Sequence, residues 1–227
     1  LAWAGAGAPD MSLVLADEQP PGRGRAARKW ITPPGSALAM SLVLRPTDVE
    51  ADHLPRFTAL GALGLIRALA HWDLQAELKW PNDVLLDGKK TAGVLVEADW
   101  QGDQLKALVL GMGVNVLPGS VPEAGQVRYP ATCVAEALGG AVDRWLLLGQ
   151  VLKEMLALRA ILPEQRFLDE WQAALAFKGQ RIWFRQPGGE PRQVRVAGLD
   201  SEGAIVLEGE DGGKVSAVAG EILMAYN

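Results

Sequence analysis

The pattern of the chain changes at Lys178-Gly179, and this change limits the folds that the chain can adopt. Before this point, apolar residues recur at helical spacing over Leu54 to Trp72 and again between Asp143 and about Phe177. After it, short apolar runs alternate with glycine-containing turns. We therefore predict an α+β domain over residues 1–178 and a small β domain over residues 179–227, whose pattern is typical of a five-stranded barrel.

The larger domain is expected to contain a sheet as well as helices. Asp87-Gly88 is typical of a two-residue β-hairpin turn, and Gln101-Gly102-Asp103 marks a second turn in the same meander. We therefore expect a mixed or antiparallel sheet with helices packed on it. The predicted strands are Met11–Asp17, Ala37–Leu44, Leu78–Leu86, Thr91–Asp99 and Leu105–Val116. The predicted helices are Leu54–Trp72, Ala131–Leu138 with a glycine stop, a long helix capped by Asp143 and running to Leu162, and one from Pro163 to about Phe177.

The charge balance argues against a general polyanion-binding protein. The chain has 22 Lys and Arg against 27 Asp and Glu, a net charge of −5, so phosphate or nucleic-acid chemistry needs a local basic cluster. One cysteine and two histidines leave little for a disulfide or a transition-metal site, which favours a reducing compartment and the cytoplasm. The longest uncharged stretch, Ala107 to Pro122, is too short and too interrupted by Gly and Pro to span a bilayer.

A local basic cluster is present in Gly22-Arg23-Gly24-Arg25-Ala26-Ala27-Arg28-Lys29-Trp30. Its cations repel one another, so we expect the loop Pro20–Lys29 to be mobile alone and to become ordered around an anion that the arginine side chains grip. The prolines and glycines at its start argue against regular structure there. Trp30 offers an aromatic face on which a base could stack. A solvated surface loop, a nucleic-acid arm and a nucleotide-binding loop all fit this composition.

Two other regions carry polar or glycine residues where a strand is expected. Lys79 ends a predicted strand just before Trp80-Pro81, where its charge can sit against a developing negative charge. Asn82-Asp83 can bind a ribose, a base edge or Mg²⁺, and is also common in turns. Gly93 and the Gly111-x-Gly113-x-Asn115 stretch lie within predicted strands, where glycine indicates a bulge or a close approach of a ligand to the backbone.

In this order and spacing, the motifs resemble those of the biotin protein ligases. The matching stretches are Ala16-Asp17-Glu18-Gln19, Gly22-Arg23-Gly24-Arg25 with Arg28 and Trp30, Lys79-Trp80-Pro81-Asn82-Asp83, Lys90-x-Ala92-Gly93-Val94-Leu95-Val96-Glu97, and Gly111-x-Gly113-x-Asn115. The last 48 residues, ending in Gly220-Glu221-Ile222, resemble the SH3-like domain of the family, so the resemblance covers essentially the whole chain.

The chain also departs from the family pattern. Ala27 stands where the family commonly has Gly. The family's Ser-Thr-Asn biotin motif lies upstream of Leu1, so we expect the chain to begin inside a longer protein. No winged-helix DNA-binding domain precedes Leu1 in this sequence, so a repressor role is not expected.

The resemblance implies a catalytic domain like those of class II synthetases and a carbon–nitrogen bond-forming ligase that works through an acyl-adenylate. The carboxylate of biotin attacks the α-phosphate of ATP, giving biotinyl-5′-AMP and pyrophosphate. A lysine of the biotin carboxyl carrier protein of acetyl-CoA carboxylase then expels AMP. ATP with Mg²⁺ is the implied co-substrate and biotin the substrate, with no tightly bound metal. A homodimer through a free sheet edge is possible, and neither a nucleic-acid nor a membrane partner is expected.

The resemblance also implies roles for individual residues. The implied catalytic residues are Lys79 and Arg25. The implied biotin-binding residues are Gln19, Arg23, Gly24, Arg25, Lys79, Gly93 and Leu95. The implied ATP or adenylate contacts are Gly22, Arg23, Arg25, Arg28, Trp30, Asn82 and Asn115, and Asp83 is a weak candidate for Mg²⁺.

Two other functions remain open at this stage. A lipoate-protein ligase has the same fold, although the paired Gly-Arg-Gly-Arg favours biotin. A non-catalytic module that grips nucleic acid with residues 22–29 belongs to a different class. Release of pyrophosphate that depends on biotin separates the biotin ligase from this module.

Overall fold

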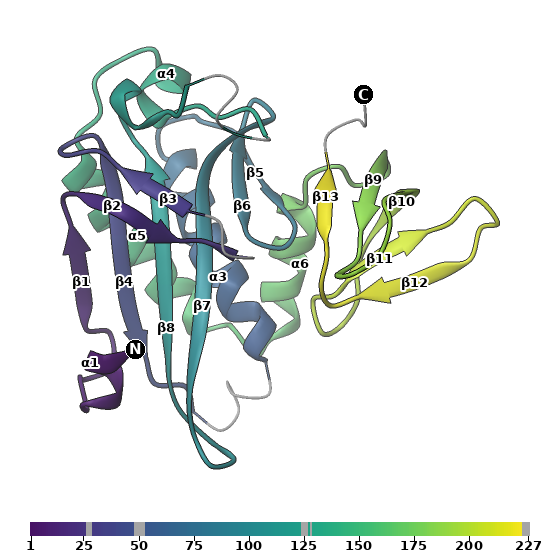
Figure 1. Ribbon diagram of the computed structural model, residues 1–227, viewed down its shortest axis with the longest axis horizontal. Coiled ribbons are helices and arrows are strands. Elements are labelled where there is room, and N and C mark those ends of the chain that lie inside the picture. The colour runs from purple at the N-terminus through teal and green to yellow at the C-terminus, as the bar shows by residue number, and fades with distance from the viewer. Residues whose placement is uncertain (26–28, 48–52, 124–126, 128, 224–227) are drawn as a thin grey trace.

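The computed structural model describes residues 1–25, 29–47, 53–123, 127 and 129–223 (Figure 1). Its larger sheet has six strands in the order β1-β4-β8-β7-β6-β5, and every neighbouring pair is antiparallel. The expected mixed or antiparallel sheet is therefore antiparallel. Its strands are β1 (Leu13–Ala16), β4 (Ala37–Leu44), β5 (Ala76–Lys79), β6 (Asp83–Leu86), β7 (Lys89–Gln101) and β8 (Gln104–Asn115).

The predicted single strand Leu78–Leu86 is wrong, because the chain turns in its middle. β5 and β6 form a hairpin in which Lys79 pairs with Asp83. The turn is closed by the Asn82 amide, which donates to the Lys79 carbonyl at 3.2 Å. Proline has no N–H to give to a strand ladder, so Pro81 fits the turn rather than a strand interior. The turn places the ends of both strands, and their charged side chains, side by side.

Helices cover one face of this sheet (Figure 1). The strands turn their large apolar side chains toward it, including Leu42 in β4 and Leu110 in β8, and these join the helices in one core. The helices can lie close to the sheet and to one another because glycines stand at the contacts. Gly61 lies against Leu110 of the sheet, and Gly64 lies against Met155 of a neighbouring helix. The helices that contribute to this core are α3 (Leu54–Ala70), α4 (Val134–Leu138), α5 (Arg144–Arg159) and α6 (Gln165–Ala174). The short helix α1 (Ala2–Gly5) lies on the other face, where Ala4 packs with Val43 and Val109 in a separate cluster. A 3-10 turn spans Pro118–Ser120.

The helix ends follow the capping residues in the sequence. Asp143 caps α5, as predicted, by accepting hydrogen bonds from the amides of Trp145 and Leu146 at 2.8 and 3.2 Å. Gly139 ends α4 in the left-handed conformation, with a φ of 67°. Within the described ranges, no helix is both long enough and apolar enough to cross a membrane.

The opposite face carries a two-stranded ribbon of β2 (Gln19–Arg23) and β3 (Lys29–Thr32) (Figure 1). The expectation that the Pro-Gly stretch excludes regular structure is therefore wrong. The pairing register shifts between Gln19 and Gly22, so the two prolines between them fall in an irregularity of the ladder. Residues 26–28 lie outside the described residues, so the expected mobility of this loop stays a prediction.

A second antiparallel sheet contains the C-terminal strands in the order β12-β11-β10-β9-β13. These strands are β9 (Arg181–Arg185), β10 (Arg192–Leu199), β11 (Ile205–Glu208), β12 (Lys214–Ala217) and β13 (Glu221–Leu223). The predicted β-rich C-terminal region with five strands is confirmed. Among the described residues, the end strands β12 and β13 are not paired with each other, so closure into a barrel stays a prediction.

The two sheets share one apolar core. Phe184 of β9 belongs to the same cluster as Leu78 of β5, and its ring centroid lies 6.2 Å from that of Trp80. Trp80 also donates its indole N–H to the carbonyl of Gly203 at 3.2 Å. The C-terminal sheet therefore packs directly against the β5–β6 turn.

Candidate active site

The centre of the sheet face opposite the core helices is lined by five small residues and one leucine. In the strand register, Ala39 of β4 lies beside Gly113 of β8, which lies beside Gly93 of β7. The next row on the same face contains Ser41, Gly111 and Leu95. We call these six positions the floor.

The floor has room for a ligand above Gly111. The atoms nearest to a Cβ placed on Gly111 would be the carbonyl oxygens of Leu95, at 3.6 Å, and of Met40, at 4.0 Å. These are ordinary contacts with the sheet itself, so the space above the backbone is open. The sequence interpretation of Gly111 as a place of close approach agrees with this geometry.

Trp30 covers one end of the floor from the β2–β3 ribbon. A Cβ at Gly113 would overlap the Trp30 indole, so this ring lies directly on the glycine backbone. The indole Nε1 is buried and has no hydrogen-bond partner among the residues that the structure describes. An aromatic ring beside an open floor suits a ligand that carries a heterocycle.

Three charged side chains meet where the β5–β6 turn reaches β7. The Asp83 Oδ1 atom lies 2.6 Å from Lys90 Nζ, and its Oδ2 atom lies 3.5 Å from Lys79 Nζ. Asp83 and Lys79 are buried, with 8% and 5% of their surfaces exposed, whereas the Lys90 side chain is 25% exposed. One carboxylate thus holds two lysines, of which Lys90 is the more accessible.

The geometry corrects the expectation that the head group of Lys79 is free to reach a ligand. Burial lowers the pKa of Lys79, and the charge of Asp83 opposes this shift. Its Nζ lies 4.6 Å from the ring centroid of Tyr129, whose pKa is raised by burial. In the strand register, Lys79 lies in the same row as Gly93 of the floor, with Asp83 between them.

Lys90 is the residue whose importance the sequence interpretation missed. Its Nζ lies 5.6 Å from the ring centroid of Trp30 and would lie 3.3 Å from a Cβ on Gly93, so it stands at the edge of the floor. The available signal is its place in the matching stretch Lys90-x-Ala92-Gly93, to which the resemblance assigns a role for Gly93 and none for Lys90.

Asp83 does not fit the Mg²⁺ role that the sequence suggested. Both of its oxygens already face lysine ammonium groups, which repel a divalent cation. Over the described ranges, no group of three or more His, Cys, Asp or Glu side chains is placed to hold a metal. We therefore infer that Asp83 is the counter-ion of Lys79 and Lys90 rather than a ligand of Mg²⁺.

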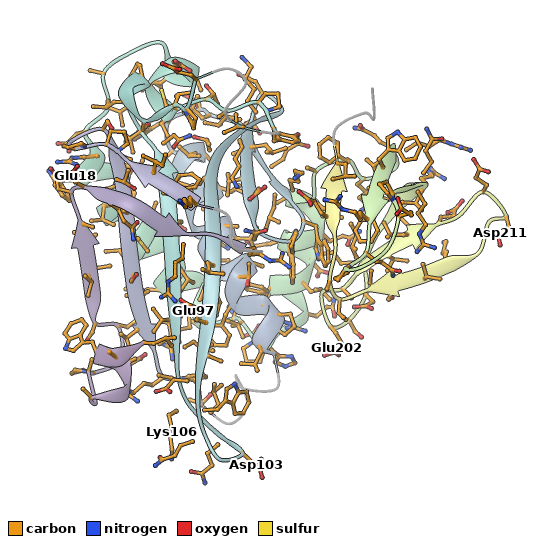
Figure 2. The ribbon with its side chains drawn as sticks, in the orientation of Figure 1. Glu18, Glu97, Asp103, Lys106, Glu202 and Asp211 are labelled. Carbon is orange, nitrogen blue, oxygen red and sulfur yellow. The ribbon has the colours of Figure 1, made fainter. Side chains whose placement is uncertain are left out.

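The ribbon arginines reach different parts of the site. Arg23 Nη1 lies 2.8 Å from the carboxylate of Glu97 in an exposed ion pair. Figure 2 labels Glu97 on β7. Arg25 Nη1 donates to Asn82 Oδ1 at 3.3 Å, which joins the ribbon to the β5–β6 turn. Gly24 lies between these two arginines, and Arg28 falls outside the described residues.

Asn115 and Gln19 have supporting positions. Asn115 is buried at the end of β8, where its side-chain amide donates to the Thr132 carbonyl at 3.2 Å. Gln19 begins the ribbon, and its Oε1 atom would lie only 2.6 Å from a Cβ placed on Gly22. Of the predicted site residues, the structure brings Trp30, Asn82 and Asp83 together at one end of the floor.

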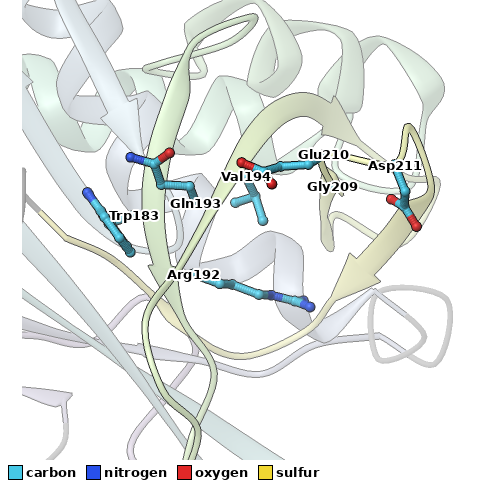
Figure 3. A pocket seen from close by; sticks show the side chains of 7 residues that line it. All are labelled: Trp183, Arg192, Gln193, Val194, Gly209, Glu210 and Asp211. Carbon is cyan, nitrogen blue, oxygen red and sulfur yellow. The ribbon is translucent and has the colours of Figure 1, made fainter.

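A cavity of about 550 Å³ lies elsewhere, on the C-terminal sheet (Figure 3). Its lining residues come from β9, β10 and the β11–β12 turn, and none was predicted as a site residue. They are Trp183, Arg192, Gln193, Val194, Gly209, Glu210 and Asp211. The charged cluster at the floor and this cavity share no residue.

Comparison with known proteins places this geometry in a family. Residues 3–115 match the Biotin/lipoate A/B protein ligase family. The chain is 36% identical over 217 residues to the biotin–[acetyl-CoA-carboxylase] ligase of Paracoccus denitrificans, covering 91% of this chain and 88% of the relative. It is 31% identical over 238 residues to the ligase of the same name from Mycobacterium tuberculosis, covering 98% and 83%.

Other relatives extend beyond the matched region. The bifunctional ligase/repressor BirA of Bacillus spizizenii is 31% identical over 217 residues, and the match spans 64% of that relative's length. Among solved structures, a biotin protein ligase from Aquifex aeolicus in complex with biotin and ATP superposes with a TM-score of 0.80 at 26% identity, covering 95% of this chain and 90% of that one. The chain therefore belongs to the biotin protein ligase family.

Proposed function

We propose that the chain is an ATP-dependent biotin–protein ligase that forms biotinyl-5′-AMP and transfers biotin to a lysine of a carrier protein. The observation that carries this proposal is the open floor at Gly111, which ends at the Trp30 ring and the Lys90 ammonium group. The names of the relatives and the biotin and ATP in the Aquifex aeolicus structure support the choice of substrates.

In the proposed first step, biotin lies on the floor with its carboxylate toward Lys90. A carboxylate oxygen attacks the α-phosphorus of ATP, the bond to the bridging oxygen breaks, and pyrophosphate leaves. Lys90 neutralises the charge on the carboxylate and the α-phosphate, and Asp83 keeps Lys90 in place. Catalysis here requires positioning and charge rather than an enzyme nucleophile.

In the second step, a neutral lysine amine of the carrier attacks the acyl carbon of the adenylate. A carbon–nitrogen bond forms, the bond between the acyl carbon and the phosphate oxygen breaks, AMP leaves with the electron pair, and the attacking nitrogen gives up one proton to solvent. Arg25 stands at the end of the ribbon, where it can hold the phosphate of the intermediate. We propose the biotin carboxyl carrier protein of acetyl-CoA carboxylase as the carrier, because two relatives carry acetyl-CoA carboxylase in their names.

The remaining assignments are also proposals. Biotin contacts are assigned to Gln19, Arg23, Gly24, Arg25, Lys90, Gly93 and Leu95, and adenylate contacts to Gly22, Arg23, Arg25, Arg28, Trp30 and Asn115. Mg²⁺ is expected to arrive bound to ATP. We propose that residues 1–178 form a catalytic domain of the class II synthetase type and that residues 179–227 form an SH3-like domain, and we place the protein in the cytoplasm.

A homodimer through the free edge of β1 is part of the proposal. β1 ends the larger sheet and pairs only with β4 among the described strands. Its Val14 and Leu15 are exposed, as is usual for an edge that another strand covers. Sedimentation at several protein concentrations tests this arrangement.

The function is tested by measuring pyrophosphate release with ATP and either biotin or lipoate. We expect release that depends on biotin, and a loss of about 100-fold in Lys90→Ala, because a preorganised cation at a developing charge is removed. Lys89→Ala is the matched control, since that neighbouring side chain is exposed. Release with lipoate alone favours the lipoate ligase, and release with neither contradicts the proposed reaction.

A further inference from the structure

Asn82 is held in one orientation by the β-sheet. Its main-chain N–H donates to the Lys79 carbonyl at 3.2 Å, and its carbonyl accepts from the Val94 amide at 2.9 Å. Its side-chain Nδ2 donates to the Val94 carbonyl at 2.9 Å. These bonds tie Asn82 to β7 on both its main chain and its side chain, and they point Oδ1 away from β7 as a fixed acceptor.

The guanidinium group of Arg25 donates a hydrogen bond to this acceptor. Arg25 Nη1 lies 3.3 Å from Asn82 Oδ1, although the two residues are 57 positions apart in the chain. Arg25 is the second residue after β2, beyond the point where the ribbon leaves its paired region. A long arginine side chain loses considerable rotamer freedom when it grips a ligand. An acceptor that is already fixed reduces this loss, because part of the ordering exists before the ligand binds.

We propose that Asn82 is a positioning residue that holds Arg25 over the acyl-adenylate and thereby slows the escape of this intermediate. The inference rests on the proposed function. It differs from the direct adenylate contact that the sequence suggested for Asn82, because the hydrogen bonds of this side chain go to Arg25 and Val94. The expected effect appears in the lifetime of the complex with the intermediate.

The test is the dissociation rate of biotinyl-5′-AMP from the full chain, measured by chasing labelled biotinyl-5′-AMP with an unlabelled excess. We expect Asn82→Ala to raise this rate about tenfold, the usual effect of losing one hydrogen bond to a charged group. In an Arg25→Ala background, the same change should add nothing, because the partner through which Asn82 acts is absent. Asp103→Ala, at the exposed tip of the β7–β8 hairpin, is the control (Figure 2).

A merely structural role for Asn82 predicts another result, in which Asn82→Ala raises the rate by the same factor in both backgrounds. That result overturns the inference. Asn82→Ser provides a second measurement if the alanine variant does not fold, because it keeps a hydroxyl donor near Val94 while moving the acceptor away from Arg25. If the parent chain does not bind biotinyl-5′-AMP, the proposed function itself fails, and this inference fails with it.

Discussion

The single carboxylate of Asp83 balances the charge of two lysines in this site. Its carboxylate faces two lysines, and the side chains of Asp83 and Lys79 are only 12% and 7% exposed. Removal of the single negative charge leaves two buried or half-buried cations without their counter-ion. Such a change is strongly unfavourable, because a charge in a low-dielectric site needs a partner.

We therefore expect Asp83→Asn to lower the free energy of unfolding by about 3 kcal/mol, as is usual when one member of a buried pair is removed. Denaturant unfolding measures this change. Asp103→Asn, on the exposed β7–β8 turn, is expected to change stability by less than about 0.5 kcal/mol. If the two variants have equal stability, Asp83 does not hold the two lysines in solution.

At the scale of single elements, the sequence predicted those parts of the fold that depend on local residues. β4 has the predicted bounds, and Asp143 caps α5 as expected. The Asp87-Gly88 turn joins β6 to β7, and both of its residues have positive φ values, of 48° and 69°. These features follow from turn and capping chemistry within a few residues, which a sequence displays directly.

The features that the sequence did not predict depend on distant partners. The β2–β3 ribbon forms despite its prolines because Trp30 packs on Gly113, about 80 positions later in the chain. The role of Lys90 depends on how the β5–β6 and β6–β7 hairpins align, including a register shift after Val84. Neither alignment is visible in a local pattern, so the sequence alone does not indicate that Lys90 lies at the floor.

The helical layer carries a charged cluster whose effect on stability depends on pH. Glu154 of α5 accepts from His71 at 3.0 Å and from Arg67 of α3 at 3.4 Å, and Arg67 also binds Glu170 of α6. The hydrogen bond from His71 lowers the pKa of Glu154, burial opposes this, and Arg67 adds to the lowering. A carboxyl group with a lowered pKa stabilises the fold above its usual pKa of 4.5, and this stabilisation is lost as the pH falls through the folded-state value.

We expect Glu154→Gln to lower the free energy of unfolding by roughly 1 kcal/mol at about pH 6, with a smaller difference at about pH 3, because the parent carboxyl gains protons as the pH falls toward its lowered pKa. Urea unfolding at the two pH values gives both numbers. A difference that does not change with pH shows that packing, rather than the charge of Glu154, accounts for its effect.

At the scale of the whole molecule, the C-terminal sheet is fixed to the larger sheet beside the candidate site. Arg56, which is buried in α3, donates to the Ser201 carbonyl at 3.2 Å, and Trp80 donates to that of Gly203 at the same distance. Gly203 has a φ of 82°, and a Cβ there would overlap the Trp171 ring of α6. The turn at residues 200–203 therefore connects the C-terminal sheet to the residue that follows Lys79.

We expect Gly203→Ala to destabilise the protein by about 2 kcal/mol or more, because it adds a steric overlap to the strain of a positive φ. Gly212→Ala is the matched control, since Gly212 has a φ of 78° but no atom within 4 Å of its Cβ position. Thermal unfolding of both variants separates backbone strain from the contact with Trp171. Equal losses would show that the contact between the turn and α6 contributes nothing.

We expect biotin to bind on the floor above Gly111. The most direct test is the dissociation constant for biotin of Gly111→Ala, measured by calorimetry. A Cβ fits the free protein at this position, since its nearest neighbours would be 3.6 Å away, but it enters the space that biotin would occupy. We predict affinity at least about tenfold weaker than in the parent. Gly149→Ala, on α5 with no atom within 4 Å of its Cβ position, should bind biotin as the parent does. Parent-like binding by Gly111→Ala would contradict the claim.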